Sequence, residues 1–596
     1  MKFATGFICA LALLGANPPT PQQREQISTG LVKLSRDIES LRARGVADER
    51  IADIEVYKKA ADWILRFEEE FFTPDYVPNT LRAIEHGLAR AADAKFSWEF
   101  AKGRIVRGYR SRVDGSVQPY ALVIPDSYDG TKPVRLDVML HGRGATLNEV
   151  SFIAAHEGTR TIPATQDFIQ LEVFGRGNNA YRWAGETDVF EALDAVKAHY
   201  KIDESRIVLR GFSMGGAGAW HLGLHYPDKW AAVEAGAGFT ETRRYAKLTD
   251  FPRQQEALLK IYDSVEYAAN ARMVPIVGYG GERDPQLQAS INIRERLASE
   301  SMTPPRILFL TGPDTEHKWH PDSLAQSNRF IEDVLRKPRV VPDHVQFVTY
   351  TTAYSKCYWV TVESLGRQYV RAEVDAIRTG DEAQVTTKNI TRLRLDGIKR
   401  AVIDGDKIET VGFGVMMLVD GKWRVSGDLK KRKRPGLQGP IDDAFRDAFL
   451  CVLPTGKPAD RFAGAYVNKL IDQFRSEWAK WMRGDLRVKK DTEVTPDDIA
   501  RYHLVAFGDQ SSNKVIREIG PLVLQRWPQN GTLPVLILPN PRSPKKYIVL
   551  NSGHTFHEAD FKGTNALLFP RLGDYSLIHA PTNSVIFSRM LDVNWR

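Results

Sequence analysis

The chain has little of what would place a protein of 596 residues in a specialised class. Cysteine occurs only 3 times, which excludes a small scaffold held together by disulfides. No spacing of cysteine and histidine is typical of a metal site, so the sequence predicts no bound metal. The formal net charge is only +8, because 82 basic residues are interspersed with 74 acidic ones, which disfavours nucleic acid as a partner.

Long apolar runs are also missing. The chain opens with MKFATGFICALALLGANPPTP, in which an apolar stretch of 12 residues, Phe3 to Leu14, is too short to cross a bilayer. A lysine before that stretch and small residues near Ala16 predict a signal peptide over residues 1–16. We therefore expect a secreted or periplasmic protein that makes no membrane contact after cleavage.

What is present fits a folded protein of several domains. Hydrophobic residues make up 43% of the chain and aromatic residues 10%, which are ordinary values for globular proteins. The length exceeds that of one domain, so several cores are expected. After loss of Cys9 with the signal, Cys357 and Cys451 lie in strand-like surroundings of different domains. Buried free thiols are the favoured interpretation, and a pairing between them stays open.

The most informative motif is a Gly-x-Ser-x-Gly sequence centred on Ser213. It lies in IVLRGFSMGGAG, residues 207–218, where a β-branched strand runs into a helix of small residues. Gly211 and Gly215 suit a sharp strand-to-helix turn in which the chain packs closely on both sides of the serine. The helix that follows aims its free N–H groups at the reacting centre, which favours an oxyanion. The motif indicates acyl transfer, although taken alone it is equally compatible with an ordinary turn.

The order of the surrounding motifs decides between these interpretations. Two buried strand-like runs follow the serine: VPIVGY ends in a loop with Asp284, and RILFL ends in a loop with His317 and His320. Upstream, RLDVMLHGRG, Arg135 to Gly144, is another buried strand, ending in a His-Gly-x-Gly loop. Serine, aspartate and histidine in this chain order, at the ends of successive strands, is the α/β-hydrolase arrangement.

These motifs resemble the esterase and prolyl-oligopeptidase-like branch of the α/β-hydrolases, which includes secreted feruloyl and acetylxylan esterases. The resemblance rests on HGRG, GFSMGGAGAW, GGERD and the final histidine loop, and it covers about residues 101–338. It implies a nucleophile at Ser213, an acid at Asp284 and a base at His317. It also implies an oxyanion hole formed by the backbone N–H groups of Met214 and Arg143, and no cofactor.

The chemistry supports the same roles, because a serine hydroxyl needs an imidazole to take its proton and a carboxylate to orient that imidazole. Glu282 and Asp263 are the competing acids. His320 is the competing base, but it adjoins Pro321, which resembles the first turn of the last helix. Three further histidines are expected to be structural, namely His141, His221 and His225.

The fold class predicted for the chain is α/β, with an α/β-hydrolase core and three further regions. Amphipathic periodicity predicts helices before the core, short alternating strands after it predict a β-sandwich-like module, and mixed elements at the end predict a small domain with a flavodoxin-like sheet. The basic run KKRKRP, Lys430 to Pro435, is interpreted as a solvated linker. The predicted boundaries are 20–100 for the helical region, 101–338 for the catalytic domain, 342–428 for the β-rich module and 436–596 for the small α/β domain.

One loop is a candidate for substrate specificity. Phe174 to Leu193 follows a strand and opens on the face predicted for Ser213. Its side chains Tyr181, Trp183 and Glu186 combine aromatic faces with hydrogen-bonding groups, as a phenolic ester or a sugar would need. The alternative is helix capping, in which Thr187 and Asp188 begin a helix over residues 189–200.

The sequence thus predicts a secreted serine hydrolase that cleaves carboxylic esters, with an ester on plant or algal polysaccharide as a candidate substrate. Tyr358 and Trp359 could stack on sugars, although such residues more often fill a core. A peptidase of the prolyl-oligopeptidase type is the first alternative, but no propeller-like repeat is present. The second is a non-catalytic surface or carbohydrate-binding protein built on a hydrolase scaffold.

Overall fold

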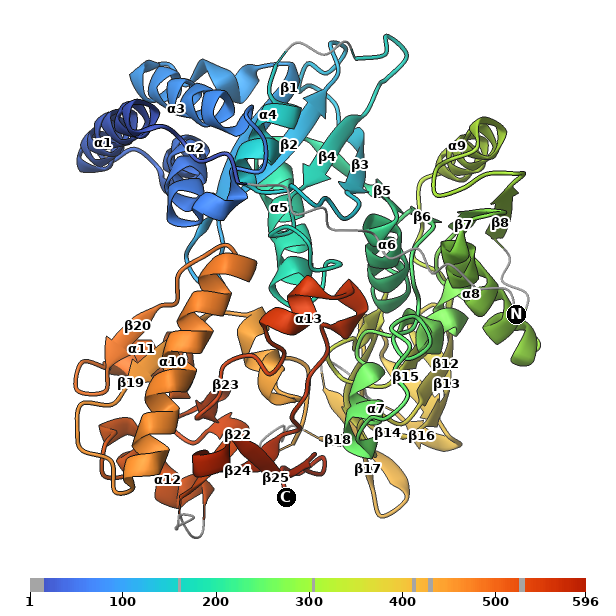
Figure 1. Ribbon diagram of the computed structural model, residues 1–596. Helices are drawn as coiled ribbons and strands as arrows, with labels where there is room; N and C mark the ends of the chain where they lie inside the picture. Colours follow the sequence, from blue (N-terminus) through green and yellow to red (C-terminus); the bar gives the residue numbers. More distant parts are fainter. Residues whose placement is uncertain (1–15, 159–161, 303–305, 410–413, 427–431, 525–530) are drawn as a thin grey trace, which may run out of the picture.

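The computed structural model describes residues 16–158, 162–302, 306–409, 414–426, 432–524 and 531–596. Figure 1 shows N-terminal helices beside a central sheet, with the β-rich part and the C-terminal part below it and helix α13 (Glu558–Lys562) near the middle. The predicted signal peptide lies almost wholly outside the described residues. Among those residues, no helix is both long enough and apolar enough to cross a membrane.

The N-terminal helices brace the central sheet. Thr20 caps the first of them through a capping box with Gln23, and its buried stripe from Ile27 to Leu41 has the spacing that predicted an amphipathic helix. The second helix lies so close to the sheet that a Cβ on Gly108 would sit 2.3 Å from the Ala52 carbonyl oxygen. The helices are α1 (Pro21–Ala43), α2 (Asp48–Arg66) and α3 (Tyr76–Ala92).

The central sheet has the order β1-β2-β4-β3-β5-β6-β7-β8. β1 and β2 pair antiparallel, β2 also pairs antiparallel with β4, and the remaining neighbours are parallel. β5, the strand that leads to Ser213, therefore lies inside the sheet with a partner on each side. The strands are β1 (Gly103–Arg110), β2 (Val117–Ile124), β3 (Val134–Leu140), β4 (Ile169–Val173), β5 (Ile202–Phe212), β6 (Ala232–Gly236), β7 (Ile276–Gly281) and β8 (Ile307–Gly312).

The helices associated with this sheet differ from expectation at one point. The helix predicted over residues 189–200 begins at Ala184, with Trp183 as its N-cap residue at φ 56°, so the predicted cap at Thr187 and Asp188 is wrong. The Trp183 N–H donates to the Tyr262 hydroxyl, which holds this unusual start. The helices are α4 (Glu149–His156), α5 (Ala184–His199), α6 (Met214–His225), α7 (Arg253–Leu259), α8 (Gln288–Ser299) and α9 (Pro321–Leu335).

The β-rich part consists of two five-stranded sheets with a shared apolar core. Trp359 is only 3% exposed within this core, so it fills the core, as such residues more often do, and is not available to stack on sugars. Cys357 is buried and free, as is Cys451 farther along the chain, which confirms the prediction of unpaired thiols. One sheet contains β10 (Lys356–Cys357), β11 (Val360–Leu365), β14 (Ile390–Leu395), β17 (Val415–Val419) and β18 (Lys422–Ser426), and the other β16 (Asp406–Ile408), β15 (Arg400–Ile403), β13 (Glu382–Lys388), β12 (Ala372–Thr379) and β9 (His344–Thr349).

The C-terminal part has a mixed sheet of order β20-β19-β21-β23-β22-β24-β25. Only β20, β19, β21 and β23 run parallel, so the flavodoxin-like prediction does not hold for the whole sheet. Three of its strands, β20, β24 and β25, had no expected counterpart. The elements are β19 (Phe449–Leu453), α10 (Arg461–Trp481), β20 (Val488–Lys490), α11 (Pro496–Arg501), β21 (His503–Ala506), α12 (Lys514–Val523), β22 (Thr532–Asn540), β23 (Ser543–Leu550), β24 (Tyr575–His579) and β25 (Ser584–Arg589).

Short 3-10 helices join these elements, and one stretch of the predicted linker is buried beside them. Lys433 is 0% exposed and forms an ion pair with Asp574, so this part of the basic run is not a solvated linker. The 3-10 helices are η1 (Glu68–Glu70), η2 (Ser97–Phe100), η3 (Ser264–Arg272), η4 (Pro285–Leu287), η5 (Ile441–Arg446), η6 (Asn565–Leu567) and η7 (Ala580–Thr582).

The C-terminal part shares one apolar core with the central sheet. Buried polar contacts cross the same boundary: Asp114 accepts from the Arg176 guanidinium at 2.7 Å and from the Trp478 indole N–H at 2.9 Å. Arg483, at the end of α10, pairs with Glu149 of α4 and Glu70 of η1. The C-terminal part is therefore integrated into the body of the molecule.

Candidate active site

Ser213 lies at the turn between β5 and α6 in a strained backbone conformation, with φ 60° and ψ −122°. The two flanking glycines of the motif are required by space. A Cβ on Gly211 would lie 2.1 Å from the Gly215 carbonyl oxygen, and one on Gly215 would lie 1.9 Å from the Leu140 carbonyl oxygen. No other residue type fits at either position, so the turn holds the serine in one orientation.

The structure brings Ser213, His317 and Asp284 into one hydrogen-bonded row. His317 Nε2 lies 2.8 Å from Ser213 Oγ, and His317 Nδ1 lies 2.7 Å from Asp284 Oδ2. The other carboxylate oxygen of Asp284 accepts from the Gln286 N–H at 2.9 Å. The Asp284 side chain is 2% exposed and that of His317 is 40% exposed, so the buried end of the row orients the imidazole and the open end faces solvent.

Two loops after β7 and β8 hold the acid opposite the base. The Glu282 N–H donates to the Gly312 carbonyl and the Arg283 N–H to the Thr315 carbonyl, each at 2.9 Å. The Glu282 carboxylate accepts a hydrogen bond from the Asp314 N–H at 2.8 Å.

The other competing residues of the sequence analysis have separate positions. Asp263 accepts from the Thr242 hydroxyl in the interior, where burial raises its pKa to about 7. His320 precedes α9, and its backbone N–H donates to the Tyr279 hydroxyl. His141, His221 and His225 bond to backbone carbonyls or buried side chains, in keeping with structural roles.

A second loop faces the nucleophile from β3. A Cβ on Gly142 would lie 3.5 Å from Ser213 Cβ, which places the backbone of this loop against the serine. Asn178 holds the loop with two hydrogen bonds, from its amide to the Gly144 carbonyl at 2.8 Å and from the Gly144 N–H to its side-chain oxygen at 3.1 Å. Met214 is the first residue of α6, where a backbone N–H has no acceptor within the helix.

The side chain of Arg143 points away from the serine toward the C-terminal part. Its guanidinium donates to the Gly563 carbonyl at 2.6 Å and to the Lys562 carbonyl at 3.3 Å. The Asn565 amide donates to the Asn178 carbonyl at 2.9 Å. The segment after α13 thus contacts the loop at Arg143 and its support at Asn178, a contact for which the sequence offers no motif.

The structure contradicts the predicted substrate contacts of Tyr181, Trp183 and Glu186, because all three are buried, with exposures of 0%, 2% and 2%. The Tyr181 hydroxyl donates to the His141 carbonyl at 3.1 Å, so this residue supports the loop from beneath. The Trp183 indole N–H donates to the Leu568 carbonyl at 3.2 Å. The aromatic and polar side chains that suggested a binding pocket are packed in the interior instead.

Glu186 forms the centre of a buried polar cluster. It forms an ion pair with Arg446 and accepts from Tyr226, Tyr354 and His221. Burial alone would raise the pKa of Glu186, but Arg446 and His221 more than offset this effect, so the pKa falls below its usual range. The charge is therefore retained inside the protein and links α5 to the C-terminal part.

Comparison with known proteins matches the region that carries this site. Residues 176–327 match the prolyl oligopeptidase family, Peptidase S9. The chain carries an α/β-hydrolase domain of the prolyl oligopeptidase family. The matched part of this hydrolase domain includes Ser213, Asp284 and His317, and it begins after the loop at Arg143.

A relative by sequence belongs to the esterase side of this branch. The chain is 31% identical over 124 residues to a protein named probable feruloyl esterase C from Aspergillus terreus. The match covers 20% of this chain and 46% of that protein, so it spans less than half of the relative's length.

Solved structures similar to the hydrolase domain include both esterases and peptidases. S-formylglutathione hydrolase of Staphylococcus aureus has 15% identity and a TM-score of 0.30 over 39% of this chain and 98% of its own. A ferulic acid esterase has 20% identity and a TM-score of 0.30 over 39% and 97%. Dipeptidyl peptidase 4 of Porphyromonas gingivalis has 15% identity and a TM-score of 0.31 over 41% and 37%. The hydrolase domain is thus similar to serine hydrolases of the esterase and S9 branch.

Proposed function

We propose that the protein hydrolyses carboxylic esters through an acyl-enzyme on Ser213. The observation that carries this proposal is the unbroken row from Ser213 Oγ through the His317 imidazole to the Asp284 carboxylate. A third group that orients the base is what separates an activated serine from an ordinary one.

The proposed reaction follows from this geometry. His317 Nε2 takes the hydroxyl proton as Ser213 Oγ bonds to the ester carbonyl carbon, and the negative charge develops on the carbonyl oxygen. The backbone N–H groups of Met214 and Arg143 stabilise that oxygen. His317 then donates its proton to the departing alcohol, and water repeats the sequence to release the acid and the free serine.

Two observations support esters over peptides as substrates. Peptide substrates held by strand pairing need an exposed strand edge beside the nucleophile, whereas β5 is paired on both sides. Within the described residues, the additional sheets are two five-stranded sheets and one seven-stranded sheet, and a propeller gate is not among them. The partial identity to a protein named feruloyl esterase supports aryl and feruloyl esters as the class to test first.

The natural substrate and the location of the protein belong to the same proposal. Feruloyl groups occur as esters, so an ester on a polysaccharide is our candidate substrate, and export through the predicted signal peptide would bring the enzyme to it. Hydrolysis of soluble feruloyl esters but not of feruloylated polysaccharide would contradict the polymer as substrate while leaving the reaction class intact.

The decisive experiment compares wild type with Ser213→Ala in the full mature chain. We expect turnover of a nitrophenyl ester to fall by about four to six orders of magnitude, since removal of a triad member has that effect in other serine hydrolases. A fluorophosphonate probe should label Ser213 in wild type and nothing in the variant. Ser552→Ala is the matched control, because Ser552 is buried and donates only to the Gly553 carbonyl.

Substrate choice is tested with the same preparations. We expect kcat/KM for aryl or feruloyl esters to exceed that for prolyl anilides by at least about a thousandfold, or roughly 4 kcal/mol of transition-state stabilisation. Comparable constants for the two classes would assign the protein to the peptidases.

A further inference from the structure

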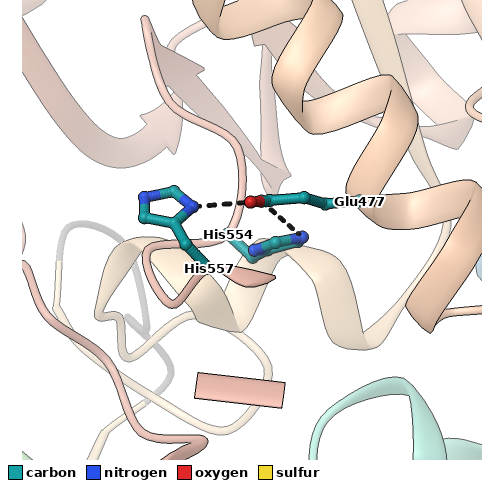
Figure 2. Close-up of side chains that lie close together, drawn as sticks. All are labelled: Glu477, His554 and His557. Atoms are coloured by element: carbon teal, nitrogen blue, oxygen red, sulfur yellow. Dashed lines mark hydrogen bonds and ion pairs between the residues drawn. The ribbon is translucent and has the colours of Figure 1, made fainter. Parts of the chain in front are cut away.

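Three side chains far from Ser213 in the sequence meet in the C-terminal part. Glu477 comes from α10, and His554 and His557 come from the loop between β23 and α13. Their ligand atoms all lie within 4.8 Å of one another. Figure 2 shows the carboxylate of Glu477 between the two imidazoles.

We propose that Glu477, His554 and His557 bind one divalent transition-metal ion of the Zn²⁺ type, and that this ion anchors helix α13 against α10. The sequence analysis predicted no metal, because Glu477 is separated from the histidines by too many residues to form a recognisable spacing. The fold supplies the missing proximity.

The distances suit such an ion. His557 Nδ1 lies 3.0 Å from Glu477 Oε2, and His554 Nε2 lies 3.8 Å from the same oxygen. Ligand atoms bonded to tetrahedral zinc at about 2.0–2.1 Å are separated by roughly 3.4 Å, which is between these two values. The third separation, between the two imidazole nitrogens, is within 4.8 Å, so an ion would draw the two rings toward it.

The orphaned nitrogen of His554 is the strongest sign of a missing ligand. His554 is 3% exposed, and its Nδ1–H donates to the Phe556 carbonyl at 2.5 Å. Nε2 of the neutral ring must then carry a lone pair. Within the described part of the chain that nitrogen has no hydrogen-bond partner, and it faces an electron-rich carboxylate oxygen. A cation bound between His554 Nε2 and Glu477 Oε2 would replace this repulsion by two coordination bonds.

The surroundings fix the donors in their orientation. The other oxygen of Glu477, Oε1, accepts from the Gln473 amide at 3.0 Å and from the Glu558 N–H at 3.1 Å, so Oε2, which hydrogen-bonds to His557 Nδ1, is the oxygen that faces both imidazoles. The His554 ring is enclosed by aromatic rings, which fix its orientation beside Glu477. The rings packed around it are those of Phe474, Trp478, Phe556 and Phe561.

The donor set decides the class of ion. Two imidazole nitrogens and one carboxylate oxygen suit Zn²⁺ and its neighbours, whereas Mg²⁺ and Ca²⁺ prefer oxygen ligands alone. The side chain of His557 is 46% exposed, so water has access to a fourth position.

Because of where the metal site lies, a bound ion would also affect the active site. This step rests on the proposed function. His557 is the residue directly before α13, and the carbonyls of Lys562 and Gly563 at the other end of that helix accept from the Arg143 guanidinium. An ion on Glu477, His554 and His557 would therefore fix helix α13, the end of which is bonded to the loop at Arg143.

The first test measures binding directly in the full mature chain after treatment with a chelator. We expect isothermal titration with Zn²⁺ to give one ion per chain, while Mg²⁺ gives no heat at the same concentrations. His557→Ala should weaken Zn²⁺ binding at least about tenfold, and Glu477→Gln should do the same. His579→Ala is the control, since His579 lies on β24 of the C-terminal sheet and its Nδ1 hydrogen-bonds to the Thr582 hydroxyl at 2.7 Å. Absence of Zn²⁺ binding, or equal binding by His557→Ala and His579→Ala, would overturn the proposal.

The second test follows α13 without reference to activity. Zn²⁺ should slow amide hydrogen exchange at least about threefold across residues 558–565 in wild type and leave it unchanged in His557→Ala. It should also raise kcat for an ester without changing labelling by a small fluorophosphonate. Unchanged exchange would contradict the anchoring role. An inactive protein that still binds Zn²⁺ and protects this segment would contradict the proposed ester hydrolysis and leave the metal site standing.

Discussion

At the scale of single residues, the site depends on side chains whose positions are determined by the backbone around them. Ser213 occupies a strained turn that only its flanking glycines permit, and Asp284 is held by the Gln286 N–H. His317 is more exposed than Asp284, since its ring reaches solvent beyond the buried carboxylate. The two histidines of the same loop, His317 and His320, therefore offer a clean comparison.

We expect His317→Ala to lower kcat/KM for an aryl ester about as much as Ser213→Ala, because the two residues act as a unit. His320→Ala should keep most of the activity, because it is the backbone N–H of His320 that bonds to Tyr279. Steady-state kinetics of both variants, with circular dichroism as a check on folding, measures this. Equal losses in the two variants would contradict the assignment of the base.

Asp114 provides a prediction about pH. Burial alone would raise its pKa, but the Arg176 guanidinium and the Ser116 hydroxyl lower it to about 2. Because the pKa in the folded state is below that in the unfolded chain, Asp114 stabilises the fold above about pH 4, and this contribution is lost as the pH falls toward 2.

The stability difference between wild type and Asp114→Asn should therefore be constant near neutral pH and shrink by roughly 2 kcal/mol between about pH 4 and pH 2. Thermal unfolding across that range measures it. A difference that does not change with pH would show that Asp114 is not a paired carboxylate in solution.

At the scale of elements, buried polar contacts join helices that the sequence assigns to separate domains. Glu186 on α5 pairs with Arg446 of η5, and Arg483 after α10 pairs with Glu149 on α4. Such pairs contribute little net stability compared with apolar packing, but the loss of one partner leaves an uncompensated charge in the interior. The cost of breaking them is therefore larger than the benefit of forming them.

Arg446→Ala should destabilise the protein by about 3–5 kcal/mol, because it leaves the carboxylate of Glu186 buried without its cation. Arg501→Ala is the control: Arg501 pairs with Asp497, and the two side chains are 64% and 70% exposed, so a change below about 1 kcal/mol is expected. Denaturant unfolding of both variants gives the two values. Similar losses would contradict a special role for the buried pair.

At the scale of the whole molecule, the C-terminal part is a structural component of the hydrolase. The sequence predicts that all catalytic groups lie before Pro338, which suggests that a fragment ending near Lys337 would be sufficient for ester hydrolysis. The shared core and the contacts of Arg143 with Lys562 and Gly563 argue otherwise.

We expect that fragment to lack a cooperative melting transition and to be inactive on a small ester. Removing the C-terminal part would expose apolar core, and it would take the Met482 carbonyl from Arg176 and the Arg483 guanidinium from Glu149 in the interior. Calorimetry and ester assays of the fragment beside the full mature chain check this. A fragment that melts cooperatively and keeps full activity would show that the C-terminal part is dispensable.

Sequence reasoning succeeds where chemistry is local and fails where distant segments meet. Ser213, Asp284 and His317 could be placed together because each follows a strand in a known order, and parallel strands end at one edge of a sheet. Trp183 could not be recognised as a helix start, because its positive φ depends on the Tyr262 hydroxyl.

The same limit applies to buried charges and to the proposed metal site. Lys433 belongs to a basic run, so the sequence predicts that it is exposed to solvent. In the structure it is buried and bonds to Asp574, which lies 141 residues later. Glu477 and His557 are 80 residues apart and meet only because α10 packs beside α13. Pairings of this kind are not visible in the amino-acid sequence of either segment.

The bond between Arg143 and Gly563 joins residues 420 positions apart, and this sets an order of events during synthesis. At about 5–20 residues per second, the ribosome needs roughly 20–80 s to reach Gly563 after it has made Arg143. A growing chain already contains Ser213, Asp284 and His317 during most of that interval. It lacks the Lys562 and Gly563 carbonyls that accept hydrogen bonds from Arg143. We expect nascent chains to remain inactive until translation is almost finished, so the protein would be delivered as an enzyme only when its last part has folded.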